Sequence, residues 1–168
     1  MKKRIHPSAQ IADGVIIEDD VYIGPFCIIG YPAEHKGHWN PEHQFGQVND
    51  HTVVIKKGTI LTGHVTIDAG TVRDTVIGEK CFIMKSAHIG HDAIIGGNSI
   101  ISPHAIIGGH CEIGLNVNFG MGSIIHQRAK VPDECMIGMG AIITKKTDMW
   151  KGGIFVGNPA YFLRQNKK

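Results

Sequence analysis

The sequence predicts an all-β solenoid built from six-residue repeats, and two observations carry this prediction. From Ile77 to Asp148 an apolar residue returns at every sixth position without a break. Four places after each of them stands a small or slender residue, as at Cys81, Ala87 and Ala93. Because a period of six fits neither an amphipathic helix nor a heptad, we expect short strands stacked into coils.

The repeat also sets the geometry of each coil. Three hexads make one triangular coil of 18 residues, with short parallel strands on three flat faces and turns at the corners. Stacked coils bury a narrow column of isoleucine side chains, and no single coil is stable alone. Glycines that follow the apolar position, such as Gly90 and Gly108, suit tight turns. About six to seven coils are expected.

The repeat is interrupted twice before Ile77. Hexads begin at Ile5 and stop after Ile29, and residues 31–52 are polar and have no period. Such a stretch inside a compact domain predicts a loop thrown out from one coil. A shorter pause of about four residues surrounds Asp74.

The end of the chain departs from the repeat as well. We expect residues 1–148 to form the solenoid, including the inserted loop, and residues 149–168 to form a C-terminal cap. This last segment is rich in aromatic residues that can close the open end of the column. Within it, residues 159–165 give a weak signal for a short helix.

Composition restricts the class of function. A net charge of +2 over 168 residues gives no reason to expect nucleic acid as a partner. The N-terminus has no apolar core for a signal peptide, and no run approaches the ~20 apolar residues of a membrane span, so we expect a cytoplasmic protein. Four cysteines occupy the small inward place of a hexad, which predicts buried thiols rather than disulfides or metal ligands: Cys27, Cys81, Cys111 and Cys135.

Spacing gathers several polar residues at one place. The hexads at Ile89, Ile107 and Ile125 are 18 residues apart, so they stack on one face, with neighbouring coils separated by roughly one strand spacing of ~4.8 Å. The polar residues at or beside the third place of these hexads are His91, Gly109, His110, His126 and Gln127, with His88 closing the preceding hexad. A cluster of this composition is a candidate site.

Five strings in the chain are similar to a known family. They are IHPSAQI at Ile5, IGPFCIIG at Ile23, AHIGHD at Ala87, GGH at Gly108 and IHQ at Ile125. In these strings the chain resembles the UDP-N-acetylglucosamine acyltransferases of lipid A synthesis, over roughly residues 5–145. The resemblance implies a left-handed parallel β-helix, a homotrimer, and transfer of an acyl group from a thioester to a nucleotide sugar.

The same resemblance assigns roles to three residues. His91 corresponds to the general base, Asp92 to the carboxylate that orients it, and Gly109 to a backbone N–H that faces the thioester oxygen. Imidazole, with an unperturbed pKa near ~6.5, can accept the proton of an attacking amine or hydroxyl at neutral pH. A donor N–H stabilises the developing oxyanion. This chemistry needs no metal and no permanently bound cofactor, because an acyl carrier protein thioester or acyl-CoA is the co-substrate.

Other matches concern the substrates. Positions that line the pocket between two subunits correspond to His88, His110, His126 and Gln127. The chain departs from the family at Asp68, where a histidine is common, and at Lys36, which is displaced by one place in the sugar-nucleotide loop. Only about twenty residues follow the last coil, so the helical C-terminal domain of the family is expected to be missing. The acceptor sugar can therefore differ.

Two features bear on the acyl group. Met139 occupies the position at which the family measures acyl chain length, and Met136 matches a pocket methionine, so we expect a short acyl group. The string VGNPAYFLR at Val156 resembles the ending of acetyl-CoA-dependent hexapeptide transferases. An acetyl-CoA-dependent sugar acetyltransferase of surface polysaccharide synthesis is therefore the alternative, and the choice between acyl carrier protein and CoA stays open.

Two further classes compete with an acyltransferase. A γ-type carbonic anhydrase uses the same solenoid with zinc held by three histidines, but this chain has no H-x4-H pair in its repeats. A non-catalytic solenoid, such as an assembly subunit or an ice-binding surface, does not require HIGHD and HQ together. The sequence thus favours a homotrimeric nucleotide-sugar O- or N-acyltransferase with His91 as base.

Overall fold

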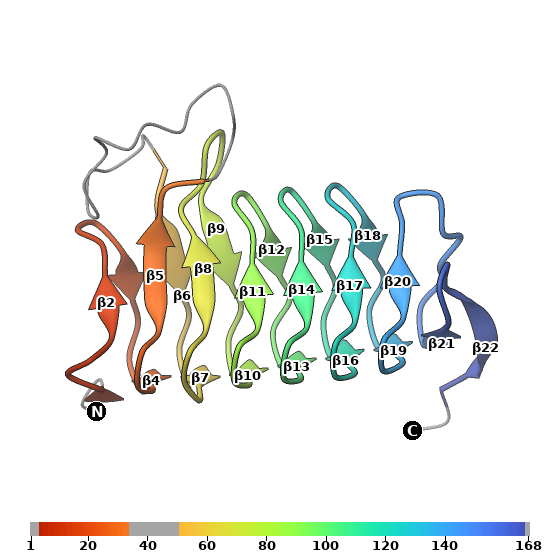
Figure 1. The fold of residues 1–168 in the computed structure, drawn as a ribbon, viewed down its shortest axis with the longest axis horizontal. Helices are drawn as coiled ribbons and strands as arrows, with labels where there is room; N and C mark the ends of the chain where they lie inside the picture. Colours follow the sequence, from red (N-terminus) through yellow and green to blue (C-terminus); the bar gives the residue numbers. More distant parts are fainter. Residues whose placement is uncertain (1–3, 34–50, 167–168) are drawn as a thin grey trace.

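A computed structural model describes residues 4–33 and 51–166 of the chain. Figure 1 shows short strands stacked along one axis, with the two termini at opposite ends of the stack. Within the described ranges the chain forms strands and turns but no helix. Nothing in these ranges therefore resembles a helix long and apolar enough to cross a membrane.

The strands form three sheets, one on each face of the solenoid. The nine-stranded sheet contains β1 (Arg4–Ile5), β4 (Tyr22–Ile23), β7 (Ile60–Leu61), β10 (Phe82–Ile83), β13 (Ile100–Ile101), β16 (Asn118–Phe119), β19 (Met136–Ile137), β21 (Gly153–Val156) and β22 (Tyr161–Gln165). The seven-stranded sheet contains β2 (Gln10–Ile11), β5 (Ile28–Tyr31), β8 (Thr66–Asp68), β11 (His88–Ile89), β14 (Ile106–Ile107), β17 (Ile124–Ile125) and β20 (Ile142–Ile143). The six-stranded sheet contains β3 (Ile16–Ile17), β6 (Val53–Ile55), β9 (Thr75–Ile77), β12 (Ile94–Ile95), β15 (Glu112–Ile113) and β18 (Lys130–Val131).

Neighbouring strands in each sheet lie one coil apart in the sequence. In the seven-stranded sheet His88 pairs with Ile106, and Ile106 pairs with Ile124, in parallel. The fold predicted from the period of six, a β-helix of hexapeptide repeats, is confirmed. In the described part of the chain six coils have a strand on every face, and the solenoid makes about eight turns in all. The last turns arise because β20 and β21 continue the stack.

The core is a column of inward side chains. The isoleucines that recur every six residues, such as Ile77, Ile83 and Ile89, have no exposed surface. All four cysteines are buried and unpaired, as predicted. Burial raises the pKa of the Cys111 thiol to about 11, so this group stays protonated at neutral pH. Its Sγ donates to the carbonyl oxygen of His126, in the next coil, at 3.2 Å.

The C-terminal segment continues the nine-stranded sheet at the end of the stack. β21 pairs in parallel with β19 and antiparallel with β22. Trp150 packs its ring 5.7 Å from Phe155 and 4.4 Å from Phe162. The short helix expected over residues 159–165 is wrong. This stretch forms β22 instead, because its backbone groups pair with those of β21 and thereby join the open edge of the nine-stranded sheet.

Turns join the three sheets at three corners. The histidine corner joins the seven-stranded to the six-stranded sheet, through residues 69–74, 90–93, 108–111 and 126–129. The acidic corner joins the six-stranded to the nine-stranded sheet, through residues 78–81, 96–99, 114–117 and 132–135. The third corner joins the nine-stranded to the seven-stranded sheet and includes Met139. The inserted loop, of which residues 34–50 lie outside the described ranges, starts and ends at the histidine corner, because it connects β5 to β6.

Candidate active site

The histidine corner repeats one backbone conformation in successive coils. The residues that adopt left-handed backbone there are Asp92 (φ 61°), His110 (φ 58°) and Arg128 (φ 63°). Each follows the third place of its hexad and precedes a buried small residue, such as Ala93 or Cys111. The regular step of one coil places His91 and Gly109 at equivalent positions of adjacent turns, as the spacing predicted.

His91 and Asp92 form a hydrogen-bonded pair. The Nδ1 atom of His91 lies 2.6 Å from Oδ2 of Asp92. The Asp92 side chain is fully buried, whereas the His91 side chain is 20% exposed. Because an ionised carboxylate only accepts hydrogen bonds, Nδ1 carries the proton and Nε2 keeps its lone pair. The imidazole is therefore oriented to act as a base through Nε2.

The Asp92 carboxylate is surrounded by donors from the preceding coil. The backbone N–H groups of Thr71, Val72 and Arg73 donate to Oδ1 at 3.0, 2.8 and 2.9 Å. The Thr71 hydroxyl donates to Oδ2 at 2.6 Å. Burial alone would raise the pKa of Asp92, but the hydrogen bonds from His91 and from this segment outweigh it and hold the pKa well below the usual aspartate value. Asp92 is therefore ionised at neutral pH.

Gly109 lies directly against the imidazole of His91. A Cβ atom at position 109 would approach Nε2 of His91 to 2.7 Å, so the ring needs glycine at this place. No acceptor in the described part of the chain receives a hydrogen bond from the Gly109 N–H. Both residues line the same pocket. The His91 imidazole and a backbone donor with no acceptor in the described ranges are thus neighbours.

His110 packs beside His91 on the solvent side of Asp92. The two imidazole rings meet edge to face with centroids 4.8 Å apart. Nδ1 of His110 lies 3.6 Å from Oδ2 of Asp92. Burial lowers the pKa of His110, and the nearby cation Arg128 lowers it further, although Asp92 acts in the opposite direction. His110 is therefore a neutral imidazole at physiological pH.

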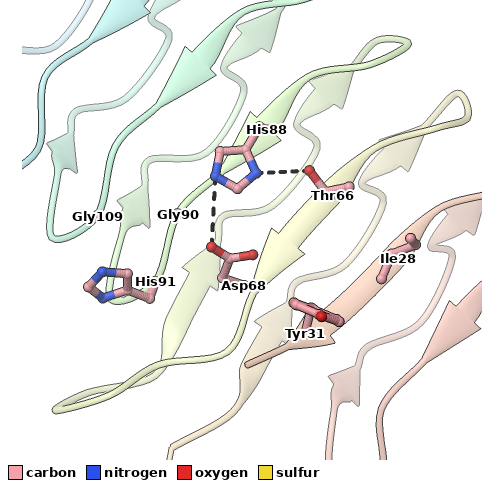
Figure 2. Close-up of a pocket in the computed structure, with 8 residues that line it drawn as sticks. All are labelled: Ile28, Tyr31, Thr66, Asp68, His88, Gly90, His91 and Gly109. Carbon is pink, nitrogen blue, oxygen red and sulfur yellow. Dashed lines mark hydrogen bonds and ion pairs between the residues drawn. The ribbon is translucent and has the colours of Figure 1, made fainter. Parts of the chain in front are cut away.

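A pocket of about 450 Å³ opens beside His91. Its lining consists of Ile28, Tyr31, Thr66, Asp68, His88, Gly90, His91 and Gly109. Figure 2 shows the side chains of His88, Asp68 and His91 around this space. His88 contacts the Thr66 hydroxyl through Nδ1 at 2.8 Å and faces the Asp68 carboxylate through Nε2 at 3.7 Å. The pocket therefore brings the His91 imidazole together with the polar side chains of Thr66, Asp68 and His88.

Comparison with known proteins agrees with the repeat. Residues 74–109 match the family "Bacterial transferase hexapeptide (six repeats)". The chain is a hexapeptide-repeat protein. It is 35% identical over 166 residues to an acyl-[acyl-carrier-protein]–UDP-N-acetylglucosamine O-acyltransferase of Campylobacter lari, and the match covers 80% of this chain and 63% of that protein. It is 30% identical over 95 residues to a UDP-3-O-acylglucosamine N-acyltransferase of Hydrogenovibrio crunogenus, covering 54% of this chain and 26% of that protein.

Solved structures show the same fold. The hexapeptide-repeat protein superimposes on UDP-N-acetylglucosamine O-acyltransferase from Moraxella catarrhalis with a TM-score of 0.77 at 24% identity, covering 97% of this chain and 75% of that one. It superimposes on perosamine N-acetyltransferase from Caulobacter crescentus with a TM-score of 0.65 at 17% identity, covering 97% and 57%. The matches span between 26% and 63% of the length of the curated relatives. The resemblance inferred from the five strings is confirmed.

The hexapeptide-repeat protein brings some predicted site residues together and separates others. His91 contacts Asp92, Gly109 and His110, and Asp68 and His88 line the adjoining pocket. His126 and Gln127 lie one coil further along the histidine corner, exposed, where Nδ1 of His126 donates to the Gln127 carbonyl oxygen at 2.9 Å. Lys36 lies outside the described residues.

The two methionines predicted for the acyl pocket are distant from this group within one chain. Met136 belongs to β19 of the nine-stranded sheet, and Met139 follows it at the third corner. Neither lines the pocket at His91. Their side chains are 37% and 72% exposed, so both are available to a neighbouring molecule.

The residues that hold Asp92 lie outside the regular repeat and are not among the predicted site residues. These are Thr71, Val72 and Arg73, together with Thr75, whose hydroxyl accepts the Asp92 backbone N–H at 2.8 Å. One signal for them was present, because the repeat pauses for about four residues around Asp74, one coil before Asp92. The irregularity in the repeat coincides with the turn whose backbone N–H groups bind Asp92.

One cluster in the described ranges has the composition of a metal site. Ligand atoms of His91, Asp92 and His110 all lie within 4.8 Å of one another. However, Oδ1 of Asp92 already accepts three N–H groups, and Oδ2 accepts the Thr71 hydroxyl and His91 Nδ1. A metal ligand at Asp92 would have to give up part of this set. The donor arrangement fits an orienting carboxylate better than a ligand.

Proposed function

We propose that this hexapeptide-repeat protein transfers an acyl group from a thioester to a hydroxyl or amine of a nucleotide sugar, with His91 as the general base. One observation carries the proposal. Nε2 of His91, oriented by the buried carboxylate of Asp92, lies against Gly109, whose N–H has no acceptor in the described part of the chain. A base and an oxyanion donor at one pocket are the two groups that acyl transfer requires.

The reaction follows from these groups. The acceptor hydroxyl or amine attacks the carbonyl carbon of the thioester while Nε2 of His91 takes its proton. The Gly109 N–H donates to the carbonyl oxygen as this oxygen becomes negative. Asp92 stabilises the imidazolium that forms. The tetrahedral intermediate then breaks its C–S bond, and the departing thiolate takes the proton back from His91.

The acceptor is proposed to be a UDP-sugar such as UDP-N-acetylglucosamine, as in lipid A synthesis. The names of the similar proteins from C. lari and H. crunogenus support this class, and so does a pocket lined by the polar groups of Asp68 and His88. His110, His126, Gln127 and Lys36 are proposed as further substrate contacts. The donor is an acyl carrier protein thioester or acyl-CoA, and no permanently bound cofactor takes part. Both substrates belong to the cytoplasm, which is the proposed location.

A homotrimer is part of the same proposal. Met139, proposed to limit the acyl chain, lies at the third corner, whereas His91 lies at the histidine corner. A second subunit that brings its third corner to this histidine corner would unite the two. The outward side chains of Ile106 and Ile124, 40% and 37% exposed, follow His88 along the same sheet and offer apolar surface for such a contact. Met136 would line the same acyl pocket.

Mass spectrometry of reaction products tests the proposal. A panel of UDP- and dTDP-sugars is offered with acetyl-CoA, longer acyl-CoA thioesters and acyl carrier thioesters, and His91→Ala serves as the inactive control. We expect an acylated nucleotide sugar with a short acyl group. Turnover with CoA thioesters alone would favour the alternative, a sugar acetyltransferase of surface polysaccharide synthesis. Absence of product with every pair would contradict the proposal.

A further inference from the structure

The turn between β8 and β9 differs from every other turn at the histidine corner in the described part of the chain. It spans residues 69–74, whereas the turns after β11, β14 and β17 follow the regular hexad. Figure 1 shows it rising above the turns of the later coils. Ten positions separate Ile67 from Ile77 instead of six. A solenoid that needed only to stack its coils would have no use for these extra residues.

The extra residues point their donors at a single carboxylate. Three consecutive N–H groups, from Thr71 to Arg73, converge on Oδ1 of Asp92. Successive N–H groups directed at one anion form a fixed positive cradle that holds negative charge in place. Oδ1 is thus fully used, and Oδ2 is left for the Thr71 hydroxyl and His91. The position of this second oxygen is set by the turn and not by His91.

Arg73 connects the turn to the two coils that follow. Its Nε donates to the Asp92 carbonyl oxygen at 2.8 Å, and its Nη2 donates to the His110 carbonyl oxygen at 3.4 Å. Its Nη1 lies 3.5 Å from Oε1 of Glu112. The guanidinium therefore fixes the backbone of both residues that flank the His91 ring. Movement of the turn would move Asp92 and His110 together.

We propose that Thr71 and Arg73 are positioning residues, and that the turn 69–74 sets the tautomer and orientation of His91 through Asp92. With Oδ1 saturated and Oδ2 directed at Nδ1, the imidazole keeps its proton on Nδ1 and its lone pair on Nε2. The inference rests on the proposed function for its effect on catalysis. Its effect on the His91 tautomer is independent of which substrate the protein uses.

The test replaces one hydroxyl. Thr71→Val keeps the shape and the backbone N–H of residue 71 but removes the donor to Oδ2, while Thr71→Ser restores a hydroxyl. Thr59→Val is the matched control, because the buried Thr59 hydroxyl, between β6 and β7, donates to the Gly78 carbonyl oxygen at 2.8 Å and not to Asp92. Two-bond ¹H–¹⁵N NMR spectra of ¹⁵N-histidine-labelled protein report the tautomer of each ring, and His91 is assigned from the signal lost in His91→Ala.

We expect His91 in the natural protein and in Thr71→Ser to be the Nδ1–H tautomer, and in Thr71→Val to be a mixture of tautomers. We also expect kcat of Thr71→Val to fall about tenfold or more with KM within about twofold, since hydrogen bonds to charged groups are among the stronger ones. Thr59→Val should match the natural protein in both measurements. An unchanged tautomer in Thr71→Val would overturn the inference. If the natural protein shows no acyl transfer, the proposed function is contradicted. The NMR comparison would still decide the positioning role.

Discussion

The histidine corner and the acidic corner are built from the same turn, and only the first holds a candidate site. The strings IGGH and IGGN occupy equivalent places in them. The backbone of His110 has φ 58°, and that of Asn98 at the acidic corner also has φ 58°. Gly109 and Gly97 precede these residues. The two corners therefore present side chains from nearly identical frames.

The difference lies in the coil that precedes each turn. A Cβ atom at Gly109 would meet the imidazole of His91 at 2.7 Å, whereas one at Gly97 would meet backbone atoms of Glu79, the nearest being the carbonyl oxygen at 3.1 Å. The histidine corner also has the extra turn 69–74, which has no counterpart at the acidic corner in the described ranges. The same backbone turn therefore occurs at both corners. The histidine corner differs in the side chains and N–H groups through which one coil contacts the next.

The largest effect is expected from removal of the base. His91→Ala should lower kcat about 10²- to 10⁴-fold, the usual contribution of a general base. Asn98→Ala is the control, because Asn98 is exposed at the acidic corner, away from the two corners that the proposed trimer would bring together. It should retain full activity. Steady-state acyl transfer and thermal unfolding of both variants make the measurement, and full activity of His91→Ala would remove the basis of the catalytic assignment.

A smaller but still large effect is expected from one methyl group. Gly109→Ala should displace the His91 ring and lower kcat about 10²-fold, because misplacement of a catalytic group by about 1 Å can cost this much. Gly109 does not have left-handed backbone, so its backbone conformation accepts alanine and the strain comes from the contact with His91. Gly97→Ala adds the same methyl group to the equivalent turn and should leave kcat unchanged. Equal kcat values for the two variants would show that the His91 contact is irrelevant to catalysis.

The two corners should also differ in how a carboxylate contributes to stability. Asp92 accepts five hydrogen bonds, whereas Asp133 at the acidic corner accepts the Leu115 N–H at 2.8 Å and remains partly exposed. Asp92→Asn should lower the free energy of unfolding by about 1.5–3 kcal/mol, as expected for hydrogen bonds to a charged group. Asp133→Asn should change it by about 0.5 kcal/mol or less. Chemical denaturation at pH 7 compares them.

The sign of the pH dependence follows from the lowered pKa of Asp92. A carboxyl group whose pKa is depressed in the folded state contributes stability that is fully present above its unfolded pKa of about 3.9. This contribution is lost as the pH falls below that value toward the folded pKa. The advantage of the natural protein over Asp92→Asn should therefore be constant from pH 7 to about pH 5 and shrink below pH 4. An advantage that grew with acidity would contradict the assignment.

The sequence predicts the fold well because the period of six is itself the structural rule. Every inward isoleucine from Ile77 onward follows it, and steps of 18 residues place His91 beside Gly109. The end of the chain obeys no such rule. β22 forms over residues predicted to favour a helix, because the open edge of the nine-stranded sheet offers backbone partners that local sequence does not reveal.

The candidate site is predictable only in part, for a related reason. His91, Asp92 and Gly109 lie in regular hexads, so the 18-residue length of a coil predicts that they are neighbours. Thr71 and Arg73 lie in the pause of the repeat, where no period indicates which way an N–H group points. The place of Met139 relative to His91 depends on a second subunit, because the two residues lie at different corners of one chain. The period of six predicts the coils, but it predicts neither the contacts made by the turn that interrupts the repeat nor those made by a second subunit.

The smallest difference between the corners is expected at their thiols. Cys111 follows the histidine corner and Cys135 the acidic corner, and both occupy the inward small place with no exposed surface. Burial raises the pKa of Cys135 as it does that of Cys111, which reaches about 11. Neither thiolate is then available at pH 8, so neither should react with a thiol reagent until the protein unfolds. Labelling followed by peptide mass spectrometry, with and without denaturant, tests this. Selective labelling of native Cys111 would show that the histidine corner opens its core in a way the acidic corner does not.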